Sequence, residues 1–181
     1  MDGLLPQAYL IGLVVLLGGA AVLVTRQILR VRRDEVTLAR LEGKAKPGQA
    51  EAADSAAYYE LASVQLRKRL YDQADTNLRQ ALRLAEREGA PAEARALIEN
   101  ALGFCLAAQG NYKGSIRHYR SALQAKADYP VALNNLAFAL EKLLKPDEAR
   151  QAYERALAID ASNGTARKRL RRLERLEQRS A

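Results

Sequence analysis

The sequence predicts an all-α protein in which an N-terminal transmembrane helix precedes an α-solenoid of three helix pairs and a C-terminal capping helix. Three observations lead to this fold class. Residues 3–25 carry no charge, a pattern of small and large apolar residues recurs three times along the chain, and the chain ends in a basic amphipathic segment. We therefore divide the chain into an anchor (1–25), a basic juxtamembrane helix and linker (26–54), the repeats (55–163) and a basic capping helix (164–181).

The uncharged run is long enough to cross a bilayer as a helix, since roughly 20 helical residues span a hydrocarbon core of about 30 Å. A core helix would be apolar along one stripe rather than on every face. A cleaved signal peptide would carry positive charge before a shorter apolar core, whereas here Asp2 precedes the run and the basic residues follow it. We expect residues 4–25 to lie in the lipid bilayer as an uncleaved anchor.

The residues that follow the run set the expected topology. Basic residues close to a span stay on the cytoplasmic side, and those that flank this span are Arg26, Arg30, Arg32 and Arg33. The large C-terminal part should then face the cytoplasm or stroma. An amphipathic extension is expected over Arg26–Leu41, and the Gly- and Pro-containing stretch Gly43–Asp54 is typical of a linker.

Internal repetition is the strongest signal in the rest of the chain. The segment Gly110–Leu123 recurs as Lys145–Leu157 and again, more weakly, as Leu70–Leu82. The later interval matches the period of about 34 residues at which paired amphipathic helices recur in the tetratricopeptide repeat (TPR). The earlier interval is longer, with its excess near Glu88–Ala92. The chain therefore resembles TPR proteins, and the resemblance implies three helix pairs, at 55–88, 96–129 and 130–163.

The repeated positions have a physical interpretation. Small residues at Ala62, Gly103 and Ala137 are expected to let the two helices of a repeat approach closely, while Tyr119 and Tyr153 fill the larger gap between repeats. Two departures from the family pattern stand out, because Gln65 and Glu99 occupy positions that are usually apolar.

The composition argues against catalysis. A single Cys and a single His exclude a disulfide or a Cys/His zinc site within one chain, and no Gly-rich phosphate-binding loop is present. By register Cys105 should be a small core residue and His118 an exposed structural one. We expect a non-enzymatic protein without metal or cofactor.

Protein binding is the remaining function, and the resemblance indicates where it would occur. In TPR proteins the first helix of each repeat lines the concave face. In this chain the expected partner-binding residues are Tyr59, Ser63, Asn100, Phe104, Asn134, Asn135 and Phe138. Asn can both donate and accept hydrogen bonds and Phe supplies apolar area; burial of one or both Phe between helices is the alternative. The Lys, Asn and Arg set with which some TPRs grip a terminal carboxylate is not formed, because Tyr59, Ser63, Ala101, Val131 and Asn135 stand there.

The last segment is predicted to be a helix over Ala166–Arg179, in which Leu170, Leu173 and Leu176 recur among seven basic residues. A solvated cap is one interpretation, since a solenoid needs capped ends. Contact with anionic lipid or an acidic protein surface is another. Nucleic acid comes third, because no recognised nucleic-acid-reading module is present.

The whole architecture, with Leu5-Pro-Gln-Ala-Tyr-Leu and Arg26-Gln-Ile-Leu-Arg-Val-Arg-Arg33, resembles the family of TPR membrane proteins of cyanobacteria and plastids that assist photosystem I assembly. The resemblance implies a thylakoid scaffold whose partners are photosystem I subunits or assembly factors. Two alternatives are a general bacterial inner-membrane scaffold for envelope complexes and a regulator of a partner enzyme.

Overall fold

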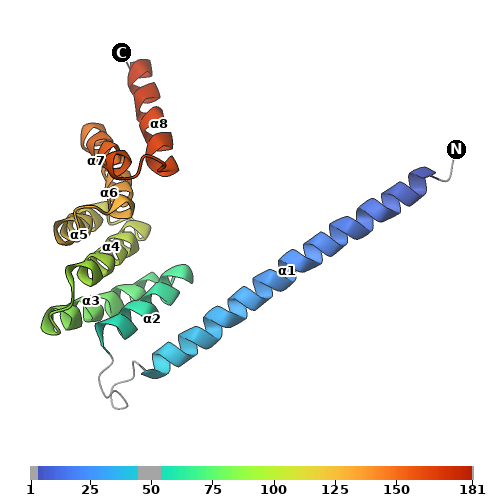
Figure 1. Cartoon of the computed structure of the whole chain (residues 1–181), viewed down its shortest axis with the longest axis horizontal. Helices are drawn as coiled ribbons and strands as arrows, with labels where there is room; N and C mark the ends of the chain where they lie inside the picture. Colours follow the sequence, from blue (N-terminus) through green and yellow to red (C-terminus); the bar gives the residue numbers. More distant parts are fainter. Residues whose placement is uncertain (1–3, 45–53, 181) are drawn as a thin grey trace. The chain divides into compact units, whose positions relative to one another are not determined.

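The computed structural model describes residues 4–44 and 54–180, and within these two ranges the regular structure is entirely helical (Figure 1). The chain divides into two compact units, residues 1–43 and residues 44–181. The expected all-α class is confirmed, with an apolar N-terminal helix in the first unit and a solenoid of helix pairs in the second. Most of the expected linker, residues 45–53, lies outside the described residues.

The first unit is a single helix, α1, which spans Leu4–Lys44 without a break. The anchor and the amphipathic extension expected from the sequence are therefore parts of one helix. Most of its described apolar side chains are exposed, such as those of Val15 (68% exposed) and Leu23 (68% exposed). Residues 12–39 are long and apolar enough to cross a membrane, by a test that a signal sequence also passes. None of its apolar window is buried, which sets this segment apart from the core helix of a soluble protein.

The second unit begins with six helices in three antiparallel pairs, which Figure 1 shows stacked in chain order. Their bounds are α2 Ser55–Arg67, α3 Tyr71–Arg87, α4 Ala92–Ala108, α5 Tyr112–Ala125, α6 Pro130–Lys142 and α7 Pro146–Ile159. Local sequence explains several of their N-termini. The carboxylate of Asp54 accepts a hydrogen bond from the Ala57 amide. The side-chain oxygen of Asn111 likewise accepts one from the Gly114 amide. Proline begins α6 and α7, at positions where the missing N–H costs no helical hydrogen bond.

The first repeat interval is longer than the second because helices α3 and α4 are longer than their counterparts. Helix α3 has 17 residues where α5 and α7 have 14, and α4 has 17 where α2 and α6 have 13. These three and four extra residues account for the whole excess of the first interval, because the loops that join corresponding helices are equally long. Helix α4 accordingly starts at Ala92, four residues before the expected start of the second repeat at 96.

Close approach of paired helices occurs at the predicted small residues. Ala62 and Ala137 are fully buried. A Cβ atom added to Gly103 would lie 2.5 Å from Cε1 of Tyr119, which is on the partner helix α5. Leu78 and Tyr153 follow Ala62 and Ala137 at the same sequence offset, and both are buried. Tyr119 also packs with Leu133 and Leu136 of the third repeat, as expected of a residue between repeats.

The two polar departures have local partners. Gln65 is buried, and its side-chain oxygen accepts a hydrogen bond of 2.8 Å from Asn77 on α3. Glu99 on α4 pairs with His118 on α5, with 2.6 Å between Oε2 and Nδ1. His118 is therefore half-buried and bonded, which corrects the expectation that it is simply exposed. In both repeats a polar pair between the two helices replaces an apolar contact.

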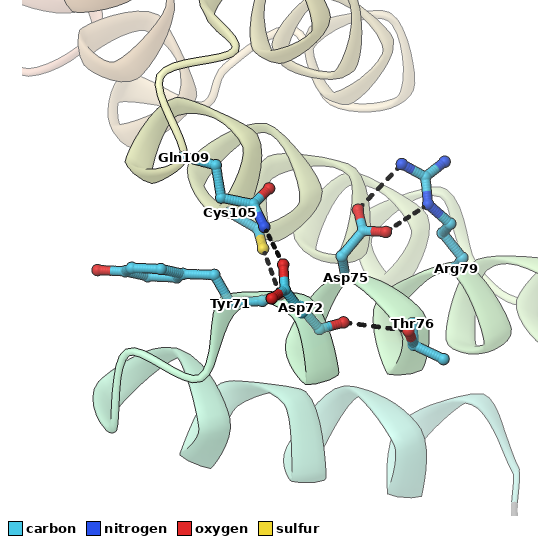
Figure 2. A network of polar contacts seen from close by, with 7 residues as sticks. All are labelled: Tyr71, Asp72, Asp75, Thr76, Arg79, Cys105 and Gln109. Carbon is cyan, nitrogen blue, oxygen red and sulfur yellow. Dashed lines mark hydrogen bonds and ion pairs between the residues drawn. The ribbon is translucent and has the colours of Figure 1, made fainter.

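Repeats one and two are joined by contacts that α4 makes with the start of α3 (Figure 2). The thiol of Cys105 donates to the carbonyl oxygen of Tyr71 at 3.1 Å, and the Gln109 amide donates to Asp72 at 2.8 Å. Cys105 is fully buried, which confirms it as a small core residue, and burial raises the pKa of its thiol to about 11. The thiol thus stays protonated at neutral pH and is a weak nucleophile.

The final helix, α8, spans Gly164–Ser180 and packs on α7. Asn163 caps it, since its side-chain oxygen accepts from the Ala166 amide at 3.0 Å. Ala166 and Leu173 lie on the face of α8 that packs on the solenoid, and both are buried. By register Arg171 takes the place of Ala62, Gly103 and Ala137. A side chain as long as arginine at that position prevents another helix from packing as closely as within the repeats.

The turn inside each repeat contains one residue in the left-handed region, at Arg69 (φ 60°), Gly110 (φ 82°) and Leu144 (φ 57°). Only the second repeat has glycine there, and a left-handed non-glycine residue costs about 1–2 kcal/mol. Leu144 is 88% exposed.

We expect Leu144→Gly to raise the free energy of unfolding by about 0.5–1 kcal/mol, after the extra chain entropy of glycine is deducted. Chemical denaturation measures this, and Leu144→Ala, which keeps the strain, should not stabilise. A loss of stability in Leu144→Gly would contradict the interpretation.

Candidate partner-binding site

The first helices of the repeats, α2, α4 and α6, contact one another in order. They carry all seven expected site residues, and one hydrogen bond joins two of these across a repeat boundary. The amide nitrogen of Asn135 on α6 donates to the side-chain oxygen of Asn100 on α4 at 3.0 Å. Both side chains are half-buried. The pair therefore links the second and third repeats and leaves polar atoms near the surface.

Tyr129 belongs to the same cluster, although sequence reasoning missed it. It directly precedes α6. Its pKa is raised first by burial and then by the neighbouring Tyr59, and the polar side chain of Asn100 lowers it in part. Lys126 places its ammonium 5.7 Å from the centre of the Tyr129 ring. Residues Tyr59, Asn100, Tyr129 and Asn135 thus form one amide–aromatic cluster over three repeats. The register of the repeats points only to the first helices, whereas Tyr129 comes from the loop between repeats.

The two phenylalanines, which share a register position, have different surroundings. Phe104 lies one turn after Asn100 on α4 and is 46% exposed. Phe138 is half-buried and meets the Tyr112 ring edge-on, with 6.4 Å between ring centres. The guanidinium of Arg169 on α8 lies 4.9 Å from its ring centre. Phe104 is therefore the aromatic side chain that remains open to a ligand, and Phe138 helps to hold the capping helix.

Asn134 and Ser63 are engaged within the fold. Asn134 donates to Asn163 at 3.1 Å, and Asn163 is buried at the start of α8. Asn134 therefore helps to position the capping helix. The Ser63 hydroxyl donates to the Tyr59 carbonyl oxygen at 2.8 Å, one turn earlier in the same helix.

The third repeat is attached to α8 through a short polar chain. The Tyr153 hydroxyl donates to Glu141 at 2.7 Å, and Arg169 reaches the other oxygen of that carboxylate at 3.5 Å. The pKa of Tyr153 is raised, first by burial and then by this hydrogen bond. A carboxylate shared by a phenol and a guanidinium ties α6, α7 and α8 together.

The basic residues that flank the apolar segment lie on α1. Arg26, Arg30 and Arg32 are exposed, and the side chain of Arg33 is outside the described set. In the described ranges no cluster of three His, Cys, Asp or Glu side chains could hold a metal ion.

Comparison with known proteins identifies the family. The model of the tetratricopeptide repeat matches residues 54–128 and 96–162, which together make up more than half of the chain. The chain belongs to the tetratricopeptide repeat family. As a TPR protein it belongs to a family of protein-interaction scaffolds, which is not typically enzymatic.

Three relatives of this TPR protein are similar beyond the repeats. A Guillardia theta protein named "Uncharacterized protein ycf37" is 32% identical over 94% of this chain and 93% of its own length. The protein of that name from Cyanophora paradoxa is 30% identical over 97% of this chain and 99% of its own length. The Arabidopsis thaliana "Tetratricopeptide repeat domain-containing protein PYG7, chloroplastic" is 30% identical over 90% of this chain, which matches 52% of that protein.

Among solved structures, the first TPR domain of Spaghetti (RPAP3), bound to an HSP90 peptide, superposes with a TM-score of 0.64. It is 16% identical, and the match covers 71% of this chain and 97% of that one. At this identity the likeness establishes the TPR fold alone.

Proposed function

We propose that this protein is a non-enzymatic, membrane-anchored scaffold that assists the assembly or stability of photosystem I, with its repeats on the cytoplasmic or stromal side of the thylakoid membrane. Alignment along nearly the whole chain carries the proposal. A match over 97% of the chain cannot be confined to the repeats and must include most of α1. The alignment therefore extends over the segment of the apolar helix as well as over the repeats, and one of the relatives is named as chloroplastic.

The anchor is supported by the composition of α1. Its apolar part is followed by Arg26, Arg30 and Arg32, whose charges favour the cytoplasmic or stromal side. If residues 4–25 lie in the bilayer, the site residues on α2, α4 and α6 are held near the membrane in which photosystem subunits reside. A membrane-anchored scaffold meets its membrane-embedded partners by lateral diffusion in the bilayer rather than by diffusion through the whole compartment.

The partner would be held by the amide–aromatic cluster and Phe104. Asn100 and Asn135 can offer donors and acceptors to an extended backbone, while Phe104, Tyr59 and Tyr129 offer apolar rings. Asn134, by contrast, hydrogen-bonds to Asn163 at the start of the capping helix, and Phe138 contacts Arg169 of that helix. Substitutions of these two residues would also disturb the capping helix, so they are poor probes of binding.

The test is recovery of photosystem I subunits with the tagged full-length protein from detergent-solubilised thylakoids. We expect Phe104→Ser to reduce that recovery about tenfold, as truncation of a central aromatic residue does in other interfaces, with the fold retained because the ring is nearly half exposed. Ile159→Ser is the matched control, because Ile159 is similarly exposed (41%) but lies on α7. Recovery in Phe104→Ser equal to wild type, with loss when residues 167–179 are removed, would exclude the cluster as the binding site.

Topology is tested in the same membranes. In sealed thylakoids of native orientation, added protease should digest the repeats, because the cytoplasmic or stromal face is outward in that preparation. Deletion of residues 1–43 should release the repeats into the soluble fraction. Repeats that resist protease in sealed membranes would contradict the proposed side.

A further inference from the structure

The outward face of α8 has an unusual charge distribution. Successive residues of a helix are rotated by about 100°. Ala166, Leu170 and Leu173 consequently share the face that packs on the solenoid, where Ala166 and Leu173 are buried. The opposite face carries five exposed basic side chains, namely Arg167, Lys168, Arg171, Arg172 and Arg175. Glu174 falls outside this sector. We call these five residues the basic face.

The basic face is not required for attachment of α8. Attachment uses Arg169, which reaches Glu141 and the Phe138 ring. Within residues 54–180, by contrast, the five side chains form no ion pair with a described residue. Arg167 and Arg175 bond to backbone carbonyl oxygens only, of Ala161 and Arg171. Five like charges side by side repel one another, so the arrangement disfavours the isolated helix unless anions lie opposite.

The position of the face also leaves it open. Arg171 stands where the preceding repeats have the small residues that admit a partner helix. Helix α8 therefore presents a charged surface that does not allow the close helix approach seen within the repeats. The five charges lie along a single helix, and such a row suits an extended anionic plane better than a single acidic peptide.

An anionic membrane surface fits this chemistry best. The chain has two strongly basic segments, residues 26–46 with a net charge of +4 and residues 164–181 with +5, and residues 55–163 between them carry only +2. The first segment follows the apolar part of α1, so an anionic leaflet that attracts one segment attracts the other. Leu176, which is 49% exposed, directly follows Arg175, lies one helical turn after Arg172 and borders the basic face. An apolar side chain at the edge of a basic row is typical of interfacial helices.

We propose that the basic face of α8 binds anionic lipid headgroups of the membrane in which α1 is anchored. This inference rests on the proposed anchoring. The protein then contacts the bilayer at both ends, and the second contact limits the orientations in which the repeats present the amide–aromatic cluster. Because α1 keeps α8 near the surface, a weak contact suffices, as the attached helix experiences a high local concentration of lipid.

The experiment uses the full-length protein in lipid nanodiscs, either of phosphatidylcholine alone or with about a third phosphatidylglycerol, a common anionic lipid. Hydrogen exchange is followed by mass spectrometry in peptides from α8 and from α5. We expect exchange in α8 to slow about fivefold in the anionic discs, since a ligand protects a helix in proportion to its occupancy. Exchange in α5 should not change. The protection should disappear at about 1 M salt, where charges are screened within roughly 3 Å.

The variant Lys168→Gln, Arg171→Gln, Arg175→Gln should lose this protection while its circular dichroism stays unchanged, because glutamine is a good helix former. The matched control is Lys113→Gln, Arg95→Gln, Arg117→Gln, which removes the same types of charge from exposed positions on α4 and α5. It should keep the protection.

Equal α8 exchange in neutral and anionic discs would overturn the inference, and so would equal loss of protection in the two triple variants. If α8 is protected only after solubilised photosystem I is added, the basic face binds an acidic protein surface instead and the lipid proposal is wrong. Failure of the wild-type chain to enter neutral discs would contradict the anchoring itself, which distinguishes the two proposals.

Discussion

Gly103→Leu is expected to lower the free energy of unfolding by about 3 kcal/mol, at the upper end of the usual cost of overpacking a core. Even a single added Cβ atom would lie 2.5 Å from Cε1 and 2.6 Å from Cδ1 of Tyr119. Tyr119 cannot easily move, because its ring is 1% exposed and packs in turn with Leu133 and Leu136. The clash would therefore spread from the second repeat into the third. Urea denaturation of residues 44–181, followed by circular dichroism, measures the effect.

Two further variants test this explanation. Gly164→Ala adds a methyl group where nothing lies within 4 Å of a built Cβ atom, so its stability should match wild type. Gly103→Ala combined with Tyr119→Leu recreates the pairing of Ala62 with Leu78 in the first repeat. In a double-mutant cycle the pair should be less destabilised than the sum of its single variants by about 1 kcal/mol or more. Additive effects would mean that Gly103 and Tyr119 are not coupled as the structure indicates.

Tyr153→Ala is expected to cost about 3–5 kcal/mol, the range for truncation of a large buried ring. The ring is 1% exposed and lies in the cluster formed by the third repeat and α8. Its hydroxyl donates to Glu141, which also receives Arg169. Loss of the whole side chain would open a cavity and weaken the attachment of α8. Thermal unfolding of residues 44–181 would show the loss.

Tyr153→Phe separates the ring from the hydroxyl. It should cost only about 1–2 kcal/mol, because the packing stays and one hydrogen bond to a charged group is lost. Hydrogen exchange should rise more in α8 than in α2, which lies at the other end of the solenoid. If Phe and Ala variants are equally unstable, the hydrogen bond to Glu141 matters more than the packing of the ring.

Local sequence was sufficient to predict the architecture. A small residue followed by a large one at a constant offset, as in Gly103 with Tyr119, determines where two helices can approach. Repetition of that pair at a period of about 34 residues determines the solenoid. The long uncharged run likewise predicted the apolar helix α1. Such features depend on side-chain size and on the periodicity of a helix, and both can be read without knowing any distant contact.

Contacts between repeats were decided only by the tertiary structure. Asn134 and Asn135 are neighbours in sequence, yet Asn134 bonds Asn163 at the capping helix and Asn135 bonds Asn100 in the preceding repeat. Phe104 and Phe138 share a register position, but only Phe138 has a basic helix next to it, so only Phe104 remains open. Gln65 bonds to Asn77 and His118 bonds to Glu99, and the local sequence pattern does not predict either pair. A polar side chain bonds to the groups that surround it in the folded protein, and these come from residues up to 37 positions away.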